Sequence, residues 1–304
     1  MSEDYLLLTK DITKQYKNVL AVDHINLSLK KGEIYGLIGP NGAGKTTLLK
    51  MLAGLAAPTE GDYTVFGKSG KSTASLRDRI GVLIETPGLF SNLSAFQNMK
   101  VKALALGFND DDYIRELIDY VGLSSAGKRP VKKYSLGMKQ RLGIALSLVS
   151  HPDLLLLDEP INGLDPQGII EMRELILKLN KEQGITVLIS SHILDELAKL
   201  ATHYGFIDHG KIIRQMSATE LENECRKRIR MKVDDTKVLA GIMDAKGVEY
   251  KIIDEKNAEV FSTFNFSELA VEFAKENCNI ISMEEHDESL EAFFISLIGG
   301  EAHA

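Results

Sequence analysis

Residues Ile34–Leu49 read IYGLIGPNGAGKTTLL, which is an apolar run, a glycine-rich loop and the start of a helix-like segment. Within this stretch, Gly39, Gly44, Lys45 and Thr46 fit the phosphate-binding pattern G-x-x-x-x-G-K-S/T. Glycines let backbone N–H groups surround phosphate oxygens, and the helix that follows points its positive end at them. The stretch therefore predicts a strand–loop–helix unit that binds a nucleoside triphosphate.

The polar side chains of this loop carry its chemistry. Lys45 is expected to reach the β- and γ-phosphates, and the Thr46 hydroxyl is expected to ligate Mg²⁺. The residues that we expect to surround the phosphates are Gly39, Pro40, Asn41, Gly42, Ala43, Gly44, Lys45, Thr46 and Thr47.

A second motif follows a run of four leucines, Leu154–Leu157, which leads directly into Asp158 and Glu159. The run is short, does not alternate and precedes a turn, so it predicts a fully buried strand. Ligands bind at the carboxyl ends of strands in open α/β sheets, which brings both acids near the nucleotide. Asp158 suits the Mg²⁺ shell, and Glu159 suits a base that polarises the attacking water. A pair of turn acids that cap the next helix is the alternative.

A third motif, YSLGMKQRLGIA at residues 134–145, places Ser135 and Gly137 in the first turn of a predicted helix. A serine hydroxyl and bare backbone N–H groups at a helix N-terminus make a second phosphate-binding site. An N-cap serine followed by a glycine turn is the simpler alternative. Because the first loop already holds the chain's own nucleotide, we expect this second site to meet the nucleotide of a partner chain.

Composition narrows the class of protein. A length of 304 residues suggests about two domains. The net charge of −7 argues against nucleic acid as the main partner. Only two cysteines occur, and no apolar run reaches the length of about 18 residues that a membrane-spanning helix needs. We expect a reduced, cytosolic protein without a secretory signal.

The basic stretch Arg226–Lys232 predicts a solvated linker, with contact to lipid headgroups or RNA as the alternative.

Periodicity predicts the organisation of the chain. Short strands and turns at residues 5–35 and 61–85 indicate an antiparallel β subdomain, and residues 88–150 read as a helical subdomain. The remaining α/β alternation predicts a mainly parallel core sheet covered by helices. From about Arg230, the order β-α-β-β-α-β predicts a small ferredoxin-like α+β domain. Helices are predicted at residues 46–55, 94–106, 112–121, 136–149, 167–183, 193–202, 237–246 and 267–277.

Taken together, these motifs resemble the ATP-binding subunits of ATP-binding-cassette (ABC) transporters. GPNGAGKTT is similar to the Walker A motif, and YSLGMKQR stands where the family's signature LSGGQ is expected. LLLLDEP matches Walker B with its glutamate, NGLDP matches the D-loop, and SSH matches the switch histidine. The motifs span residues 39–192 in the family's order and spacing. The resemblance implies an ABC ATPase domain at residues 1–225 and a C-terminal accessory domain at 230–304.

The resemblance also implies roles for single residues. Tyr16 would stack on the adenine of ATP, and His192 would hydrogen-bond its γ-phosphate. Asp165 would link the two nucleotide sites of a head-to-tail dimer. In that dimer, each ATP would lie between Walker A of one subunit and Ser135 and Gly137 of the other. The other partner would be an integral membrane permease, which places this subunit at the cytoplasmic face of the cell membrane.

Two departures from the family pattern stand out. Glu85 replaces the usual glutamine after the strand that leads into the helical subdomain. In the signature, Leu136 replaces a glycine and Met138 a glutamine. The glutamate resembles the branch that serves bacitracin export and lantibiotic immunity. We expect Glu85 to engage Mg²⁺ or the attacking water when the permease presses on its loop. A surface acid without a nucleotide role is the alternative.

Two other functions compete with transport. A non-transport ATPase of the same superfamily would act on ribosomes or DNA, but such proteins usually carry tandem cassettes or long coiled-coil arms, which this chain does not show. A nucleotide-gated binding module with little turnover is the other alternative, and it is disfavoured by Glu159 and His192. The sequence therefore predicts an ATPase that powers a separate permease, with export of or immunity to peptide antibiotics as its role.

Overall fold

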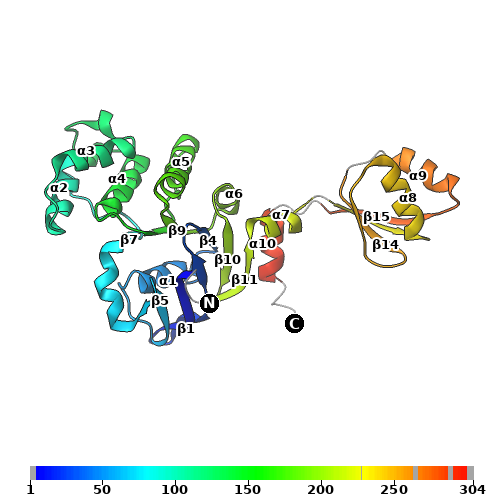
Figure 1. Ribbon diagram of the computed structural model, residues 1–304, viewed down its shortest axis with the longest axis horizontal. Helices are drawn as coiled ribbons and strands as arrows, with labels where there is room; N and C mark the ends of the chain where they lie inside the picture. Colours follow the sequence, from blue (N-terminus) through cyan, green and yellow to red (C-terminus); the bar gives the residue numbers. More distant parts are fainter. Residues whose placement is uncertain (1–4, 227, 263–265, 287–289, 300–304) are drawn as a thin grey trace. The chain divides into compact units, whose positions relative to one another are not determined.

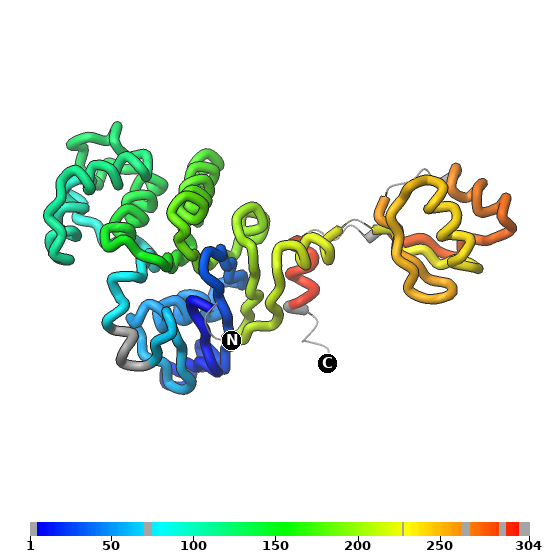
Figure 2. Tube along the Cα trace, in the orientation of Figure 1, coloured from blue at the N-terminus to red at the C-terminus, as the bar shows by residue number. Residues whose placement is uncertain are grey.

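The computed structural model describes residues 5–226, 228–262, 266–286 and 290–299. The chain divides into two compact units, Met1–Ala218 and Thr219–Ala304 (Figures 1 and 2). Among the described residues, no helix is both long and apolar enough to span a membrane.

The first unit is built on a six-stranded sheet with the order β11-β10-β4-β9-β8-β7. All neighbouring strands are parallel except the hairpin of β10 and β11. The strands are β4 (Ile34–Ile38), β7 (Ile80–Leu83), β8 (Leu154–Asp158), β9 (Thr186–Ser191), β10 (His203–Asp208) and β11 (Lys211–Ser217).

The three central strands are buried at every position, which explains why their sequences do not alternate. A strand covered by helices on both faces has no solvent side, so apolar residues occupy both faces. The helices α1 (Lys45–Leu52) and α5 (Pro166–Gln183) follow β4 and β8 in the chain. The predicted parallel core is confirmed by these pairings.

An antiparallel sheet packs against the core in the same unit. Its order is β2-β1-β5-β6, and β3 also pairs with β1. One hydrophobic cluster joins the two sheets, because Leu29 and Val65 belong to it together with Leu48 of α1 and Leu156 of β8. The elements are β1 (Tyr5–Tyr16), β2 (Val19–Ile25), β3 (Ser28–Lys30), β5 (Glu60–Val65), β6 (Lys68–Ser69) and the 3₁₀ helix η1 (Gly70–Arg79).

The helical subdomain lies between β7 and β8 in the chain and forms its own cluster in Figure 1. Its helices begin at polar caps. Ser94 forms a capping box with Gln97, and Asp110 accepts hydrogen bonds from two backbone N–H groups of its helix. The helices are α2 (Ala95–Ala105), α3 (Asp111–Tyr120) and α4 (Leu136–Leu148), with short 3₁₀ turns η2 (Ser124–Ala126) and η3 (Val131–Lys133).

The helix predicted at residues 193–202 is shorter than expected. Helix α6 (Leu194–Ala198) ends early because the chain must reach strand β10, which begins at His203. The Thr202 backbone N–H donates to the Ile34 carbonyl at 2.8 Å, which pulls the chain out of the helix and toward β4.

The second unit contains an antiparallel sheet with the order β13-β14-β12-β15. Two helices were not predicted. The seven-residue α7 buries only Leu221 and so shows no clear period. Helix α10 is apolar around much of its circumference, so its sequence does not show a stripe. The elements are α7 (Ala218–Glu224), β12 (Arg228–Val233), α8 (Thr236–Lys246), β13 (Tyr250–Ile252), β14 (Asn257–Val260), α9 (Phe266–Lys275), β15 (Ile280–His286) and α10 (Leu290–Gly299).

The prediction of a linker at the basic stretch is wrong for residues 228–232, which form strand β12, the first strand of the predicted β-α-β-β-α-β order. Ile229 and Met231 alternate with the basic residues and enter the hydrophobic core of the second unit. The guanidinium groups of Arg228 and Arg230 share one partner, the Glu259 carboxylate, at 3.2 and 3.1 Å. Cross-strand pairing of this kind lets a cationic sequence form a strand. Lys227 lies outside the described residues.

Candidate nucleotide-binding site

The glycine-rich loop joins β4 to α1 and has a backbone that requires glycine. Gly42 and Gly44 have φ values of +85° and +106°, which side chains disfavour. A Cβ atom at Gly44 would also lie 2.3 Å from the Ala21 carbonyl oxygen, whereas one at Gly42 would meet no atom within 4 Å. The open space over Gly42 leaves the loop accessible, as a phosphate cradle requires.

Lys45 begins helix α1 and is almost completely buried. Its ammonium donates to the carbonyl oxygens of Gly39 at 2.6 Å and Pro40 at 3.1 Å. A third oxygen, Oε1 of Glu159, lies 3.2 Å away. A buried cation surrounded by oxygen acceptors can exchange some of them for phosphate oxygens, so the residues present fit a nucleotide.

Thr46 and Asp158 meet at the end of strand β8. The Thr46 hydroxyl donates to Asp158 Oδ2 at 2.7 Å, and the Ser190 hydroxyl donates to Oδ1 at 2.6 Å. Hydroxyl and carboxylate oxygens are ligands that Mg²⁺ prefers, so this pair fits the metal. Sequence reasoning missed Ser190, which lies opposite Asp158 in the register of β8 and β9. Ser190 is the first residue of the SSH motif, which was interpreted only for His192.

Glu159 lies between Lys45 and His192. Its Oε2 atom is 2.8 Å from His192 Nδ1, while its Oε1 atom faces Lys45. The Glu159 backbone has a φ of +50°, in the left-handed region, and its N–H donates to Ser190 Oγ at 3.1 Å. Strained backbone at a non-glycine residue is common at functional sites. The carboxylate predicted as the base is thus held between a cation and an imidazole.

Tyr16 and Glu85 are more exposed than these residues. Tyr16 ends strand β1 with 46% of its surface exposed, and the Lys14 ammonium lies 5.0 Å from its ring centroid. Glu85 follows β7, and its carboxylate forms an ion pair with Lys50 of α1 at 2.7 Å. Sequence reasoning did not single out Lys50.

The signature segment and the D-loop lie beside each other. Ser135 caps α4 and accepts a hydrogen bond from the Met138 N–H, and Asp165 caps α5 in the same manner. A Cβ atom at Gly137 would meet only Leu164, at 3.7 Å. Among the described residues, no hydrogen bond or ion pair joins Ser135 or Asp165 to the phosphate loop.

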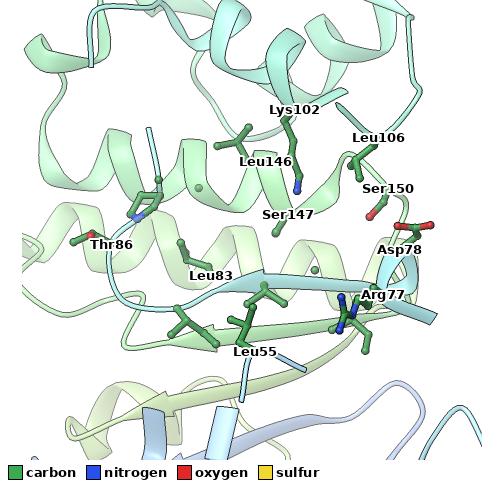
Figure 3. Close-up of a pocket in the computed structure, with 17 residues that line it drawn as sticks. Leu55, Arg77, Asp78, Leu83, Thr86, Lys102, Leu106, Leu146, Ser147 and Ser150 are labelled. Carbon is green, nitrogen blue, oxygen red and sulfur yellow. The ribbon is translucent and has the colours of Figure 1, made fainter. Parts of the chain in front are cut away.

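A cavity of about 550 Å³ lies beside Glu85, between β7 and the helices α2 and α4. Figure 3 shows Lys102 of α2 and Leu106, the residue that follows this helix, on one side of it and Leu55 and Arg77 on the other. Thr86, directly after Glu85, also lines this cavity. Its lining combines apolar side chains such as Leu83 and Leu146 with the charged side chains of Arg77, Asp78 and Lys102.

Comparisons with known proteins decide the family. The ABC transporter profile matches residues 22–162. The chain is 40% identical to the bacitracin transport ATP-binding protein BcrA of Bacillus licheniformis over 97% of this chain and 98% of that protein. The chain belongs to the ABC transporter family. It is 48% identical to the lantibiotic transport ATP-binding protein SrtF of Streptococcus pyogenes, over 72% of this chain and 93% of that protein.

Solved structures agree with this assignment. One match is the structure of CbiO1 from Clostridium perfringens, part of the ABC transporter complex CbiONQ. The match covers 73% of this chain and 92% of the CbiO1 chain, with a TM-score of 0.66 and 32% identity. The dimeric ATP-binding cassette MJ0796 bound to ADP and Pi matches 70% of this chain and 98% of its own, with a TM-score of 0.64 and 25% identity. The predicted fold and the prediction of an ATP-hydrolysing ABC transporter subunit are confirmed. The comparisons do not support the alternative of a non-transport ATPase.

Proposed function

We propose that this ATPase powers a separate integral membrane permease that exports peptide antibiotics or protects the cell against them. The observation that carries the proposal is the extent of the relationship to BcrA. The solved cassettes cover 70–73% of the chain, whereas the match to BcrA covers 97% of it and so includes the second unit. A bacitracin transport protein therefore shares both the cassette and its extension.

Within the cassette, we assign the ligand groups from the contacts described above. Lys45 and the loop N–H groups bind the phosphates, and Thr46 with Asp158 holds Mg²⁺. Bound Mg²⁺ supplies positive charge that offsets the charge of the phosphates. Glu159 accepts a proton from the attacking water, and His192 orients the Glu159 carboxylate through their contact of 2.8 Å.

The second half of each site comes from another copy of the chain. Ser135 and Gly137 present a hydroxyl and backbone N–H groups at the beginning of α4, and among the described residues neither forms a hydrogen bond with the chain's own phosphate loop. A two-fold head-to-tail arrangement places these groups against the partner's nucleotide, with Asp165 near the contact. The related cassette MJ0796 has been solved as a dimer.

The permease docks at the cavity beside Glu85. Its mixture of apolar lining residues with Arg77, Asp78 and Lys102 suits an amphipathic segment of another protein. Docking there places the subunit at the cytoplasmic face of the membrane, as a peripheral component.

The test is to express the subunit together with a candidate permease in a sensitive bacterial host. We expect copurification of the two proteins and raised resistance to bacitracin or a lantibiotic, and both drugs should be compared. Glu159→Gln should keep the copurification but remove the resistance. Unchanged sensitivity to both drugs would contradict the proposed cargo, while copurification with ribosomes in place of the permease would contradict transport itself.

A further inference from the structure

The ion pair between Lys50 and Glu85 joins two parts of the cassette that are distant in sequence. Lys50 lies in the last turn of α1, and Glu85 follows β7 at the entrance to the helical subdomain. The Lys50 ammonium lies 2.7 Å from Glu85 Oε1, with 36% and 63% of the two side chains exposed. A glutamine, the usual residue of the family at this position, could not form an ion pair with Lys50.

Helix α1 connects this pair to the phosphate site. Lys45 and Thr46 form the first turn of the same eight-residue helix, so Lys50 is little more than one turn away from them. A short hydrogen-bonded helix moves as a rigid body. Any displacement of the phosphate-binding turn therefore also moves the Lys50 side chain.

The other partner connects the pair to the cavity. Ile84 and Thr86, the two neighbours of Glu85, both line it. The Lys50 carbonyl oxygen accepts hydrogen bonds from the N–H groups of Leu55 at 2.8 Å and Ala56 at 3.1 Å, and Leu55 also lines the cavity. The ion pair thus lies where the nucleotide-binding helix meets the wall of the cavity.

Backbone and charge both indicate that Glu85 is held in place. Its φ of +61° is in the left-handed region, which costs a non-glycine residue energy that other contacts must offset. The hydrogen bond that Lys50 donates to Glu85 raises the pKa of Lys50, and the negative charge of Asp158 acts in the same direction more weakly. Lys50 therefore stays protonated and available as a counter-ion.

We propose that Lys50 is a positioning residue that holds Glu85 against helix α1 and so transmits movement between the nucleotide site and the cavity. Entry of a permease segment into the cavity displaces Ile84 and Thr86, which separates Glu85 from Lys50. Closure of the phosphate site around a nucleotide moves helix α1, and Lys50 moves with it relative to Glu85. The transmission to a permease rests on the proposed function, whereas the ion pair itself is a property of the isolated cassette.

The test is a charge swap read by hydrogen exchange of the full-length subunit without nucleotide. Lys50→Met and Glu85→Gln should each raise the exchange rate of the amides at residues 84–90 about twofold to fivefold, the range expected for an exposed ion pair. The double variant Lys50→Glu with Glu85→Lys should return the rates toward the wild-type values. The control is the swap of Arg226 and Glu249, an exposed pair at 2.6 Å in the second unit, which should leave these amides unchanged.

A second measurement tests whether movement at the cavity is transmitted to the nucleotide site. In membranes containing the permease, Lys50→Met should lower the stimulation of ATP hydrolysis by the permease, and the charge swap should recover part of it. Unchanged exchange in both single variants, or no recovery in the double variant, overturns the inference. If exchange responds as expected while permease stimulation is absent even in the wild type, the proposed partner is wrong and the ion pair's role in the cassette stands.

Discussion

At the scale of single residues, the site is a set of charges that neutralise one another. Glu159 faces Lys45 at 3.2 Å and His192 at 2.8 Å, and Asp158 accepts from the hydroxyls of Thr46 and Ser190. Each group that we assign to catalysis therefore has a protein partner that a ligand can replace or share. Such pairing holds these side chains in position.

Glu159→Gln removes the carboxylate charge but keeps its shape. We expect ATP hydrolysis to fall by about 10²-fold to 10⁴-fold, because the base is lost, while ATP still binds and holds the dimer closed. Phosphate release and gel filtration with ATP measure the two effects. Glu182→Gln, on the exposed surface of α5, is the matched control. Turnover at the wild-type rate in Glu159→Gln would refute the assignment.

Lys45→Ala should weaken ATP binding by at least about tenfold, because a single cation faces several phosphate charges. It also leaves Glu159 without its cation, and the additional negative charge repels phosphate. Titration calorimetry with ATP measures the affinity of the purified subunit. Equal affinity in the variant and the wild type would exclude this loop as the nucleotide site.

At the scale of elements, helix and strand ends collect the functional groups. The phosphate loop precedes α1, the acids end β8, and Ser135 begins α4. This placement follows from backbone chemistry, since helix N-termini expose unpaired N–H groups and strand ends present side chains at one edge of the sheet.

Ser135→Arg tests the beginning of α4 as a shared site. A bulky cation at this N-cap should block contact with a second subunit, so one chain should bind ATP with normal affinity while dimerisation and hydrolysis fail. Light scattering with ATP and calorimetry separate the two. Ser125→Arg, at an exposed position of η2, is the control. Normal dimerisation of Ser135→Arg would show that the nucleotide is not shared in this way.

At the scale of the whole molecule, the chain has two units, each with a hydrophobic cluster of its own. The cluster of the first unit includes Leu48 and Leu156, and that of the second includes Met231 and Phe273. Separate cores allow separate unfolding transitions. The functional division into residues 1–225 and 230–304 stays a prediction.

Phe273→Ala should destabilise the second unit by about 3–5 kcal/mol, because the ring is fully buried. ATP affinity should stay within about twofold of the wild type, since the nucleotide contacts lie in the first unit. Urea unfolding followed by hydrogen exchange locates the lost stability, and calorimetry measures the affinity. A large loss of ATP affinity in this variant would show that the two units fold as one.

The sequence by itself determined the parts that depend on local chemistry. The glycine-rich loop, the leucine run before Asp158 and the polar helix caps each depend on a few adjacent residues, so their patterns predicted element types and most site residues. Helices without a polar face, such as α10, were not recognised. The strand at β12 was predicted, but only its pairing with β14 and β15 excludes the competing prediction of a linker at the basic stretch, because neighbours distant in sequence decide both cases.

Only the tertiary structure decided which side chains meet. Ser190 reaches Asp158 because β9 lies beside β8, and Lys50 reaches Glu85 because α1 ends near β7. The order of strands and the direction of side chains result from packing between residues that are 32 and 35 positions apart in these two cases. Local sequence patterns do not predict such contacts, since the free energy of these contacts is gained only when the complete core forms.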